Sequence, residues 1–146
     1  MVENLSGYYI YDFTEYLGWP CPENGRFGGC DEMFAEWQAG TNQLSLLRID
    51  GELAGFTAVG VDADTHEHYI QEFFILRKFR RRGIGQRVAF ALFTQFPGPW
   101  RVEYLTANTP AQRFWPAVIQ AYLGTAQLHV EEYESSWGQK QVLRFG

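Results

Sequence analysis

The sequence has few cysteines, no long hydrophobic run and no leader-like amino terminus. Cys21 and Cys30 have neither CxxC spacing nor a histidine cluster nearby, so we expect no metal site there. Two free thiols in a reducing cytoplasm are the favoured state, and a disulfide between them is the alternative. No apolar run approaches the roughly 20 residues that cross a bilayer, and no basic segment followed by an apolar one suggests a signal peptide. These absences favour a cytoplasmic protein that does not enter a membrane.

The composition is typical of a folded domain. Hydrophobic residues make up 46% and aromatic residues 17% of the 146 positions, which argues against disorder. No repeat or low-complexity tract interrupts the chain. We therefore predict one domain over residues 1–146, a length sufficient for a substantial core. The net charge of -5 argues against general binding to nucleic acid.

Positive charge is concentrated in one short segment. Residues 77–87 hold six of the twelve Lys and Arg and no Asp or Glu, so the remainder carries six basic against seventeen acidic residues, a balance of -11. A solvated helix face would mix the two signs. We therefore predict an anion site in this segment, and a solvated arginine surface is the alternative.

Hydrophobic periodicity and turn residues predict alternating helices and strands. Asp50-Gly51 is the strongest hairpin signal, and Thr109 before Pro110 is predicted to cap the last helix. The expected fold class is α/β (α+β), a mixed sheet flanked by helices, with right-handed crossovers. The predicted helices are residues 5–17, 31–38, 84–96 and 109–122, and the predicted strands are residues 43–49, 52–59, 68–76, 100–105, 127–133 and 140–145.

Two glycines follow the basic run where a helix is expected to begin. Backbone N–H groups at a helix start lack partners, the helix dipole adds positive charge, and glycine lets a ligand approach closely. A P-loop is excluded because no Lys-Ser/Thr pair follows Gly85. A dinucleotide-binding GxGxxG motif is excluded because Val88 occupies the position of its third glycine. The segment matches the pattern [Arg/Gln]-x-x-Gly-x-[Gly/Ala], with Arg80, Gly83 and Gly85 at the defined positions.

On this motif the sequence resembles the GCN5-related N-acetyltransferases (GNAT), in which the loop binds the pyrophosphate of acetyl-coenzyme A. The segment Asn108-Thr-Pro-Ala111, followed by Phe114-Trp115, is similar to the family's second cofactor segment. The resemblance covers about residues 43–146 and is closest to a small bacterial subgroup with a YxYDF-type first helix. Two features depart from the family. No strand is predicted before the first helix, and Trp115 stands where the family has a tyrosine.

The resemblance implies splayed parallel strands that bind acyl-coenzyme A. The pantetheine arm would pair with backbone groups on one strand and with Asn108 from the other side. Asn108 as a plain helix cap is the alternative, and the two roles are compatible. The implied cofactor residues are Phe73, Phe74, Ile75, Arg80, Arg81, Arg82, Gly83, Ile84, Gly85, Gln86 and Asn108.

Acetyl transfer to an amine needs a base, because a lysine-like amine is protonated at pH 7. Glu72 is the candidate, since it lies among apolar residues of a strand, where desolvation would raise its pKa. A structural ion pair with an arginine is the alternative role for Glu72. His66 and His68 are second-choice bases. The general acid stays unassigned, since the indole of Trp115 is no acid at neutral pH.

The resemblance places the acceptor site on the first two helices and their loop, residues 5–37. Aromatic residues and carboxylates in that region suit a cationic amine, and both a small-molecule amine and a peptide amine remain open. The rival function is a non-catalytic protein that binds and senses acyl-coenzyme A, which the missing tyrosine favours. A nucleic-acid module is disfavoured by the -11 balance outside the basic run. A homodimer is a further expectation, because the absent first strand would leave a sheet edge for pairing.

Overall fold

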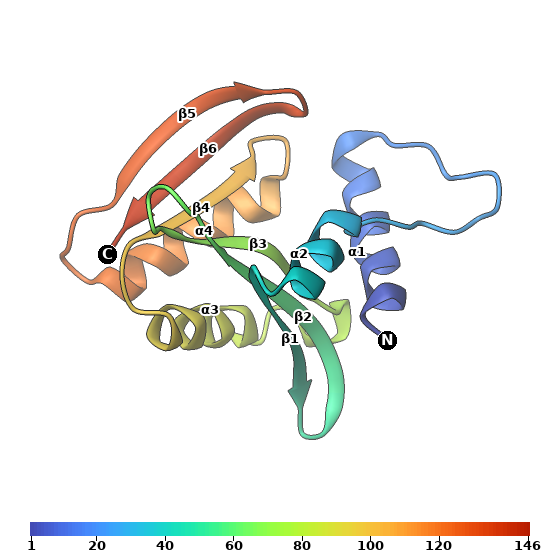
Figure 1. Cartoon of the computed structure of the whole chain (residues 1–146), viewed down its shortest axis with the longest axis horizontal. Coiled ribbons are helices and arrows are strands. Elements are labelled where there is room, and N and C mark those ends of the chain that lie inside the picture. Colours follow the sequence, from blue (N-terminus) through green and yellow to red (C-terminus); the bar gives the residue numbers. More distant parts are fainter. The chain divides into compact units, whose positions relative to one another are not determined.

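The computed structural model describes residues 1–146 as four α-helices, a 3₁₀ turn and six strands (Figure 1). The strands form a mixed sheet in the order β1-β2-β3-β4-β6-β5, which confirms the predicted fold class. None of the helices is long and apolar enough to cross a lipid bilayer. The elements in chain order are α1 (Val2–Leu17), α2 (Asp31–Ala39), β1 (Asn42–Ile49), β2 (Glu52–Val61), β3 (His68–Ile75), the 3₁₀ turn (Arg77–Phe79), α3 (Ile84–Gln95), β4 (Trp100–Leu105), α4 (Thr109–Leu123), β5 (His129–Ser135) and β6 (Gly138–Phe145).

The chain divides into two compact units. The first unit comprises residues 1–60 and 71–78, and the second comprises residues 61–70 and 79–146. Strand β3 contributes to both, because its first residues belong to the second unit and the rest to the first. The expectation of a single domain stays a prediction.

The core of the first unit joins the two amino-terminal helices to the strands. Five side chains at most 5% exposed form it: Leu5, Met33, Phe56, Ala58 and Phe74. The β1–β2 hairpin is confirmed, with Asp50 at φ 50° and Gly51 at φ 80°. Positive φ at both central residues is what a two-residue type I′ turn requires, so this dipeptide signals the hairpin for a physical reason.

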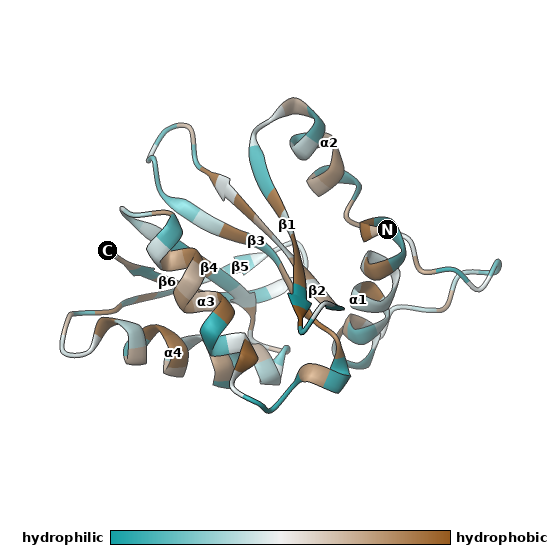
Figure 2. Cartoon of the chain, turned by 90° about the horizontal axis from the view of Figure 1, so that it is seen from below, coloured by the Kyte–Doolittle hydropathy of each residue, from teal (hydrophilic) through white to brown (hydrophobic).

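Aromatic packing dominates the core of the second unit. Trp100, Val102 and Tyr104 alternate inward along β4 and are at most 5% exposed. The Phe93 ring on α3 packs edge-on against Trp100 at 5.0 Å and Phe145 at 4.9 Å between ring centroids. Figure 2 shows hydrophobic and hydrophilic residues alternating along α3 and α4, as in amphipathic helices that bury one face.

Several boundaries differ from the predicted ones. The first helix begins at Val2, earlier than the predicted residue 5; β5 is shifted by two residues from the predicted 127–133, and β6 begins two residues earlier than predicted. The β5–β6 turn is short because the Ser135 hydroxyl donates to the Gly138 carbonyl at 2.7 Å and accepts from the Trp137 N–H at 3.2 Å. Among the described residues α1 is the first element, and no strand precedes it.

Of the two residues expected to cap the last helix, Thr109 is wrong and Asn108 is confirmed. Asn108, rather than Thr109, is the N-cap of α4, and its side-chain oxygen accepts the Ala111 N–H at 3.2 Å. Thr109 and Pro110 are the first helical residues, which suits proline because its missing N–H would have no partner there. Asparagine three residues before the bonded N–H is a strong cap, so it takes this position ahead of threonine.

Candidate active site

The glycine loop lies between the 3₁₀ turn and α3 in the second unit. Gly83 is the N-cap of α3 in a left-handed conformation, with φ 72°, and no side chain caps the helix. The first intrahelical bond runs from the Arg87 N–H to the Gly83 carbonyl, so the N–H groups of Ile84, Gly85 and Gln86 precede the helical ladder. The predicted helix start after the basic run is thereby confirmed.

The loop has the backbone features of an anion cradle. Arg81 has φ 62°, a conformation that costs a non-glycine residue about 1–2 kcal/mol. A Cβ added to Gly83 would meet no atom within 4 Å, so space is open beside the loop. Arg80, Arg81 and Arg82 are all exposed. Guanidinium groups, helix N–H groups and open space together fit the diphosphate of a nucleotide.

The first two cations of the basic run have other partners. Arg77 contacts the Asp12 carboxylate through Nε at 3.2 Å and Nη2 at 2.7 Å, and thereby ties the end of β3 to α1. Lys78 contacts Glu52 at 2.6 Å. Both pairs lie within the first unit.

Glu72 lies on β3 in the first unit, where three side chains act on its carboxylate. Burial is the largest influence and raises the pKa of Glu72. Hydrogen bonds from the Tyr9 hydroxyl and the Cys30 thiol lower this pKa in part, and the nearby Glu32 carboxylate raises it. The net result is a carboxylate with a raised pKa. The alternative role of Glu72, as partner of an arginine, finds no support, since no cation is among these influences.

The two donors beside Glu72 are themselves held in the protonated form. Burial and the Glu72 charge raise the pKa of the Tyr9 hydroxyl well above its ordinary value. The same two causes raise the pKa of the Cys30 thiol to about 12. Cys21 and Cys30 are both free thiols, and Cys21 is exposed whereas Cys30 is half-buried.

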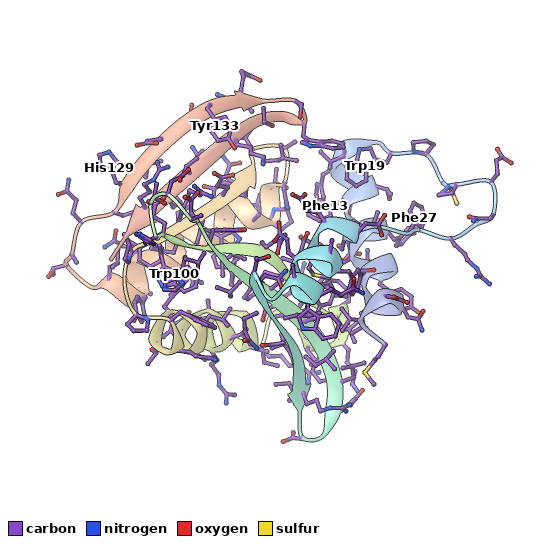
Figure 3. The ribbon with its side chains drawn as sticks, viewed as in Figure 1. Phe13, Trp19, Phe27, Trp100, His129 and Tyr133 are labelled. Atoms are coloured by element: carbon purple, nitrogen blue, oxygen red, sulfur yellow. The ribbon has the colours of Figure 1, made fainter.

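A hollow of about 290 Å³ lies in the first unit, between α1 and the end of β3. Its lining residues are Tyr8, Tyr11, Asp12, Phe74, Leu76 and Arg77. Phe74 and Leu76 follow Glu72 at two-residue steps, so the hollow lies on the face of β3 that carries Glu72. Further aromatic contacts follow along the same region (Figure 3): the rings of Phe13 and Trp19 are 6.2 Å apart, and those of Tyr11 and Phe27 are 5.5 Å apart.

The backbone of β3 is packed closely against β2. The Leu76 N–H donates to the Ala54 carbonyl at 2.8 Å, and a Cβ at Gly55 would overlap the Phe74 carbonyl. In the parallel pairing of β3 with β4, His68 lies opposite Trp100 and Tyr69 lies opposite Arg101. These pairs lie at the first residues of β3, ahead of Phe73, Phe74 and Ile75.

The second-choice bases lie in the second unit. His66 is exposed in the β2–β3 turn at φ 59°. The His68 Nε2 lies 3.2 Å from the Pro97 carbonyl, and its ring packs against Trp100 at 5.3 Å. His68 is therefore engaged in packing. Trp115 is 6% exposed on α4, as expected for a packing residue, and α4 continues through Pro116 without a break.

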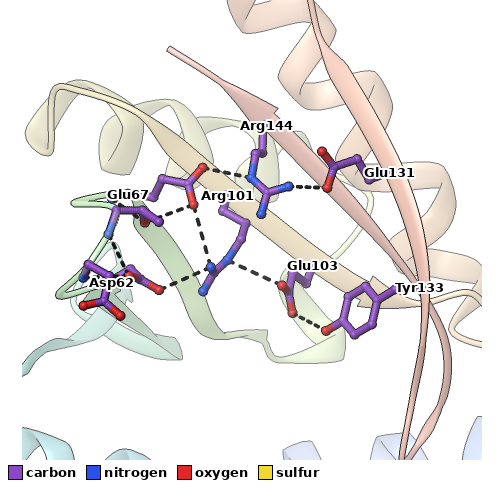
Figure 4. Close-up of polar contacts among 9 residues, drawn as sticks. Asp62, Glu67, Arg101, Glu103, Glu131, Tyr133 and Arg144 are labelled. Carbon is purple, nitrogen blue, oxygen red and sulfur yellow. Dashed lines mark hydrogen bonds and ion pairs between the residues drawn. The ribbon is translucent and has the colours of Figure 1, made fainter.

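A polar network on the second unit was not predicted (Figure 4). Arg101 pairs with Asp62 at 3.4 Å, Glu67 at 3.7 Å and Glu103 at 3.4 Å. Arg144 extends it by contacts with Glu67 and Glu131, and the Tyr133 hydroxyl donates to Glu103 at 3.1 Å. The sequence signal for this network was the alternation of Arg101 and Glu103 with the buried residues of β4, which places both charged side chains on the opposite face of the strand. The network ties the β2–β3 turn to β4, β6 and β5.

Comparison with known proteins decides the family. The model of the acetyltransferase (GNAT) family matches residues 10–117, which is most of the chain. The chain belongs to the GNAT family. Membership makes it an N-acetyltransferase domain with acetyl-coenzyme A as donor, which agrees with the loop geometry and confirms the resemblance seen in the sequence. A comparison with curated protein sequences found no match.

Solved structures of other GNAT proteins share the fold. A GNAT-family protein from Desulfovibrio desulfuricans has a TM-score of 0.64 at 15% identity, over 99% of this chain and 94% of that one. A ribosomal-protein-alanine N-acetyltransferase from Brucella melitensis has a TM-score of 0.61 at 10% identity, over 99% and 95%. RimL, a ribosomal L7/L12 alpha-N-protein acetyltransferase bound to coenzyme A, has a TM-score of 0.60 at 14% identity; the match covers 77% of this chain and 66% of RimL. These likenesses show the fold.

The GNAT site residues predicted from the sequence fall into two groups. Glu72, Phe73, Phe74 and Ile75 belong to the first unit, whereas residues 80–86 and Asn108 belong to the second. Within the first unit the structure adds Tyr9 and Cys30 to Glu72, and no sequence pattern indicated either of them. Within the second unit Asn108 caps α4, so its role toward a cofactor stays a prediction.

Proposed function

We propose that this GNAT enzyme transfers the acetyl group directly to a primary amine, with Glu72 as the general base. The observation that carries the proposal is the raised pKa of a half-buried carboxylate on β3. A base whose pKa is raised toward neutrality can accept a proton from an ammonium group and still be partly ionised at pH 7. Glu72 would thus convert the protonated amine into the nucleophilic form.

The residues of the chain are suited to distinct parts of acetyl-coenzyme A. When bound, the cofactor supplies the acetyl thioester. The diphosphate would bind Arg80, Arg81 and Arg82 together with the backbone N–H groups of residues 83–86, for which the left-handed Gly83 and Arg81 provide support. The pantetheine arm would bind backbone groups of residues 73–75 and Asn108. Charge-assisted hydrogen bonds of this kind contribute about 1.5–3 kcal/mol each.

The acceptor that we propose is a cationic amine bound at the hollow between α1 and β3. Tyr8 and Tyr11 supply aromatic faces, and the hollow shares its β3 face with Glu72. Two proteins with the same fold are described as ribosomal-protein N-acetyltransferases, which supports an amine on a protein as the acceptor. A small-molecule amine of similar charge is the other acceptor class.

A non-catalytic acyl-coenzyme A sensor is the second candidate function. The observation in its favour is Trp115, which is buried where the family has a tyrosine and has no acidic proton to donate. A sensor would bind the cofactor and release no thiol. Glu72 favours the enzyme over the sensor, because perturbed pKa values are enriched at catalytic sites.

Two measurements on the purified chain test the proposal. Coenzyme A and acetyl-coenzyme A should each raise the melting temperature, because a ligand that binds the folded state stabilises it. Free thiol should then be released from acetyl-coenzyme A when amines or basic peptides are added. Glu72→Gln should abolish thiol release and keep the melting shift. Binding without release for every amine would favour the sensor, and wild-type release by Glu72→Gln would refute Glu72 as the base.

Location and assembly complete the proposal. We propose a cytoplasmic location, which the two free thiols support because oxidising compartments favour disulfides. A homodimer is also proposed, since β1 and β5 are the edge strands of the sheet and each has a side open for pairing. Light scattering of the purified protein in solution measures its molecular mass, and the mass of a monomer at micromolar concentration would refute the dimer.

A further inference from the structure

We propose that β1 is the interface of a twofold-symmetric homodimer, in which the β1 strands of two copies pair antiparallel. The inference rests on the homodimer proposed above and adds which edge of the sheet forms it. The sheet has two edge strands, β1 in the first unit and β5 in the second. The two edges differ in the features that keep an edge strand from pairing with another chain.

Strand β5 is protected by negative charge. Three of its seven residues are glutamates: Glu131, Glu132 and Glu134. Glu131 pairs with Arg144, and Glu132 accepts a hydrogen bond from the Gln141 side chain at 2.8 Å, so both contacts are made with β6 of the same hairpin. Pairing β5 with a second copy would bring three glutamates from each chain to one seam. Like charges that lie opposite each other destabilise a strand pair.

Strand β1 lacks such protection over residues 42–47, whose sequence is NQLSLL. This segment has no charged residue and no proline, and it pairs with β2 without a break in register. The one cation of the strand, Arg48, follows a bulge at the turn end, and its Nη1 donates to the Gly51 carbonyl at 3.0 Å. A regular and uncharged edge of this kind is a template for a further strand.

The apolar layer of the first unit continues to the β1 edge. Leu46 lies opposite Phe56 of β2, which is fully buried, whereas Leu46 itself is 41% exposed. Leu44, two residues earlier on the same face, packs against the core of this unit. Helix α2, which contacts β1, exposes 52% of Trp37 one turn beyond the buried Met33. This side of the unit thus presents two large apolar side chains that a second copy would cover.

A second copy is the occupant that these features fit. A strand that pairs with itself about a twofold axis meets its own side chains, so it needs apolar residues and no charge at the axis. An axis at Leu46 places the Leu46 side chains of the two copies opposite each other, on the core face of both sheets. The two Arg48 residues then lie on opposite sides of the axis, about 13 Å apart along the strands.

The first test is the molecular mass in solution, measured by light scattering for variants at both edges. Leu46→Lys places two cations at the proposed axis, so the dissociation constant of the dimer should rise at least about tenfold. Val130→Lys is the matched control and should leave the dimer unchanged, because Val130 is 52% exposed on β5. Both side chains are exposed in the single chain, and circular dichroism checks that each variant is folded.

The second test is cross-linking in a Cys21→Ser background, since Cys21 is the exposed native thiol. Opposite residues of an antiparallel pair have Cα atoms about 4.5–5.5 Å apart, which is within the reach of a disulfide. Leu46→Cys should therefore give a disulfide-linked dimer on mild oxidation, visible on a non-reducing gel. Gln43→Cys is the control, because exposed Gln43 lies three residues from the axis and its two copies would be about 20 Å apart.

The outcomes separate this inference from the proposed function. A monomeric wild type would refute the homodimer and with it the inference, and would leave the β1 edge to a strand of another protein. A dimer that Val130→Lys breaks and Leu46→Lys keeps would overturn the assignment to β1 and leave the homodimer standing. Equal cross-linking of Leu46→Cys and Gln43→Cys would overturn the pairing at Leu46. None of these readouts needs thiol release, so a failure of the proposed acetyl transfer would be distinguishable.

Discussion

Substituting Gly55 by alanine tests the close packing of β2 against the strand that carries Glu72. A Cβ at Gly55 would overlap the Phe74 carbonyl oxygen and lie 2.9 Å from its carbonyl carbon and 3.1 Å from the Ile75 Cα. All three atoms are backbone, so no side-chain rotation relieves the overlap. Gly55 also has φ 156°, which L residues rarely adopt.

The magnitude follows from two separable costs. A non-glycine residue at positive φ costs about 1–2 kcal/mol, and overpacking a dense region costs about 1–3 kcal/mol more. Gly51→Ala is the matched control, because Gly51 has φ 80° but no atom lies within 4 Å of its Cβ position. We expect a loss of about 1–2 kcal/mol of unfolding free energy for Gly51→Ala and about 4 kcal/mol for Gly55→Ala. For a chain of this length that difference is about 4–12 °C in melting temperature.

Urea unfolding followed by circular dichroism measures both losses under one condition. The result that would refute the reasoning is an equal loss in the two variants, since the overlap with β3 would then contribute nothing. A second readout is turnover at a temperature where both variants are folded. Gly55→Ala should reduce it more than Gly51→Ala, because relief of the overlap displaces the β3 backbone at Phe74, two residues from Glu72.

Three further predictions concern the titrating groups and the helix cap. The folded-state pKa of Glu72 is raised, so its favourable contribution to stability is complete below the unfolded pKa and is lost as the pH rises through the folded pKa. Glu72→Gln should therefore be more stable than the wild type at pH 8 but not at pH 4. Equal stability of the two proteins at both pH values in urea unfolding would contradict this. Iodoacetamide at pH 8 should label exposed Cys21 rapidly and Cys30 slowly, since the Cys30 thiol has a pKa of about 12; equal labelling rates by mass spectrometry would count against it. Asn108→Ala should cost about 1 kcal/mol of unfolding free energy through the lost cap and Asn108→Asp far less, and identical denaturant midpoints for the two variants would exclude the cap as the reason.

The polar network around Arg101 shows where sequence patterns stop being informative. Alternation along β4 indicates that Arg101 and Glu103 point away from the buried face, and this much is local. The carboxylate partners come from the β2–β3 turn, where Asp62 and Glu67 lie far from β4 in the sequence. Their meeting depends on strand order, and strand order depends on how all the elements pack.

The sequence by itself determined the local structure and the family of this protein. Helical and strand periods, the Asp50-Gly51 turn and the glycines after the basic run each depend on backbone preferences within a few residues, and these are readable in one dimension. Membership of the GNAT family followed from the same short segment, because its motif encodes a phosphate-binding loop. The tertiary structure alone decided which side chains surround Glu72 and that Arg77 is paired with Asp12, 65 residues away. The physical reason is that burial and hydrogen-bond partners are set by contacts between distant segments, and the pKa of a carboxylate depends on those contacts.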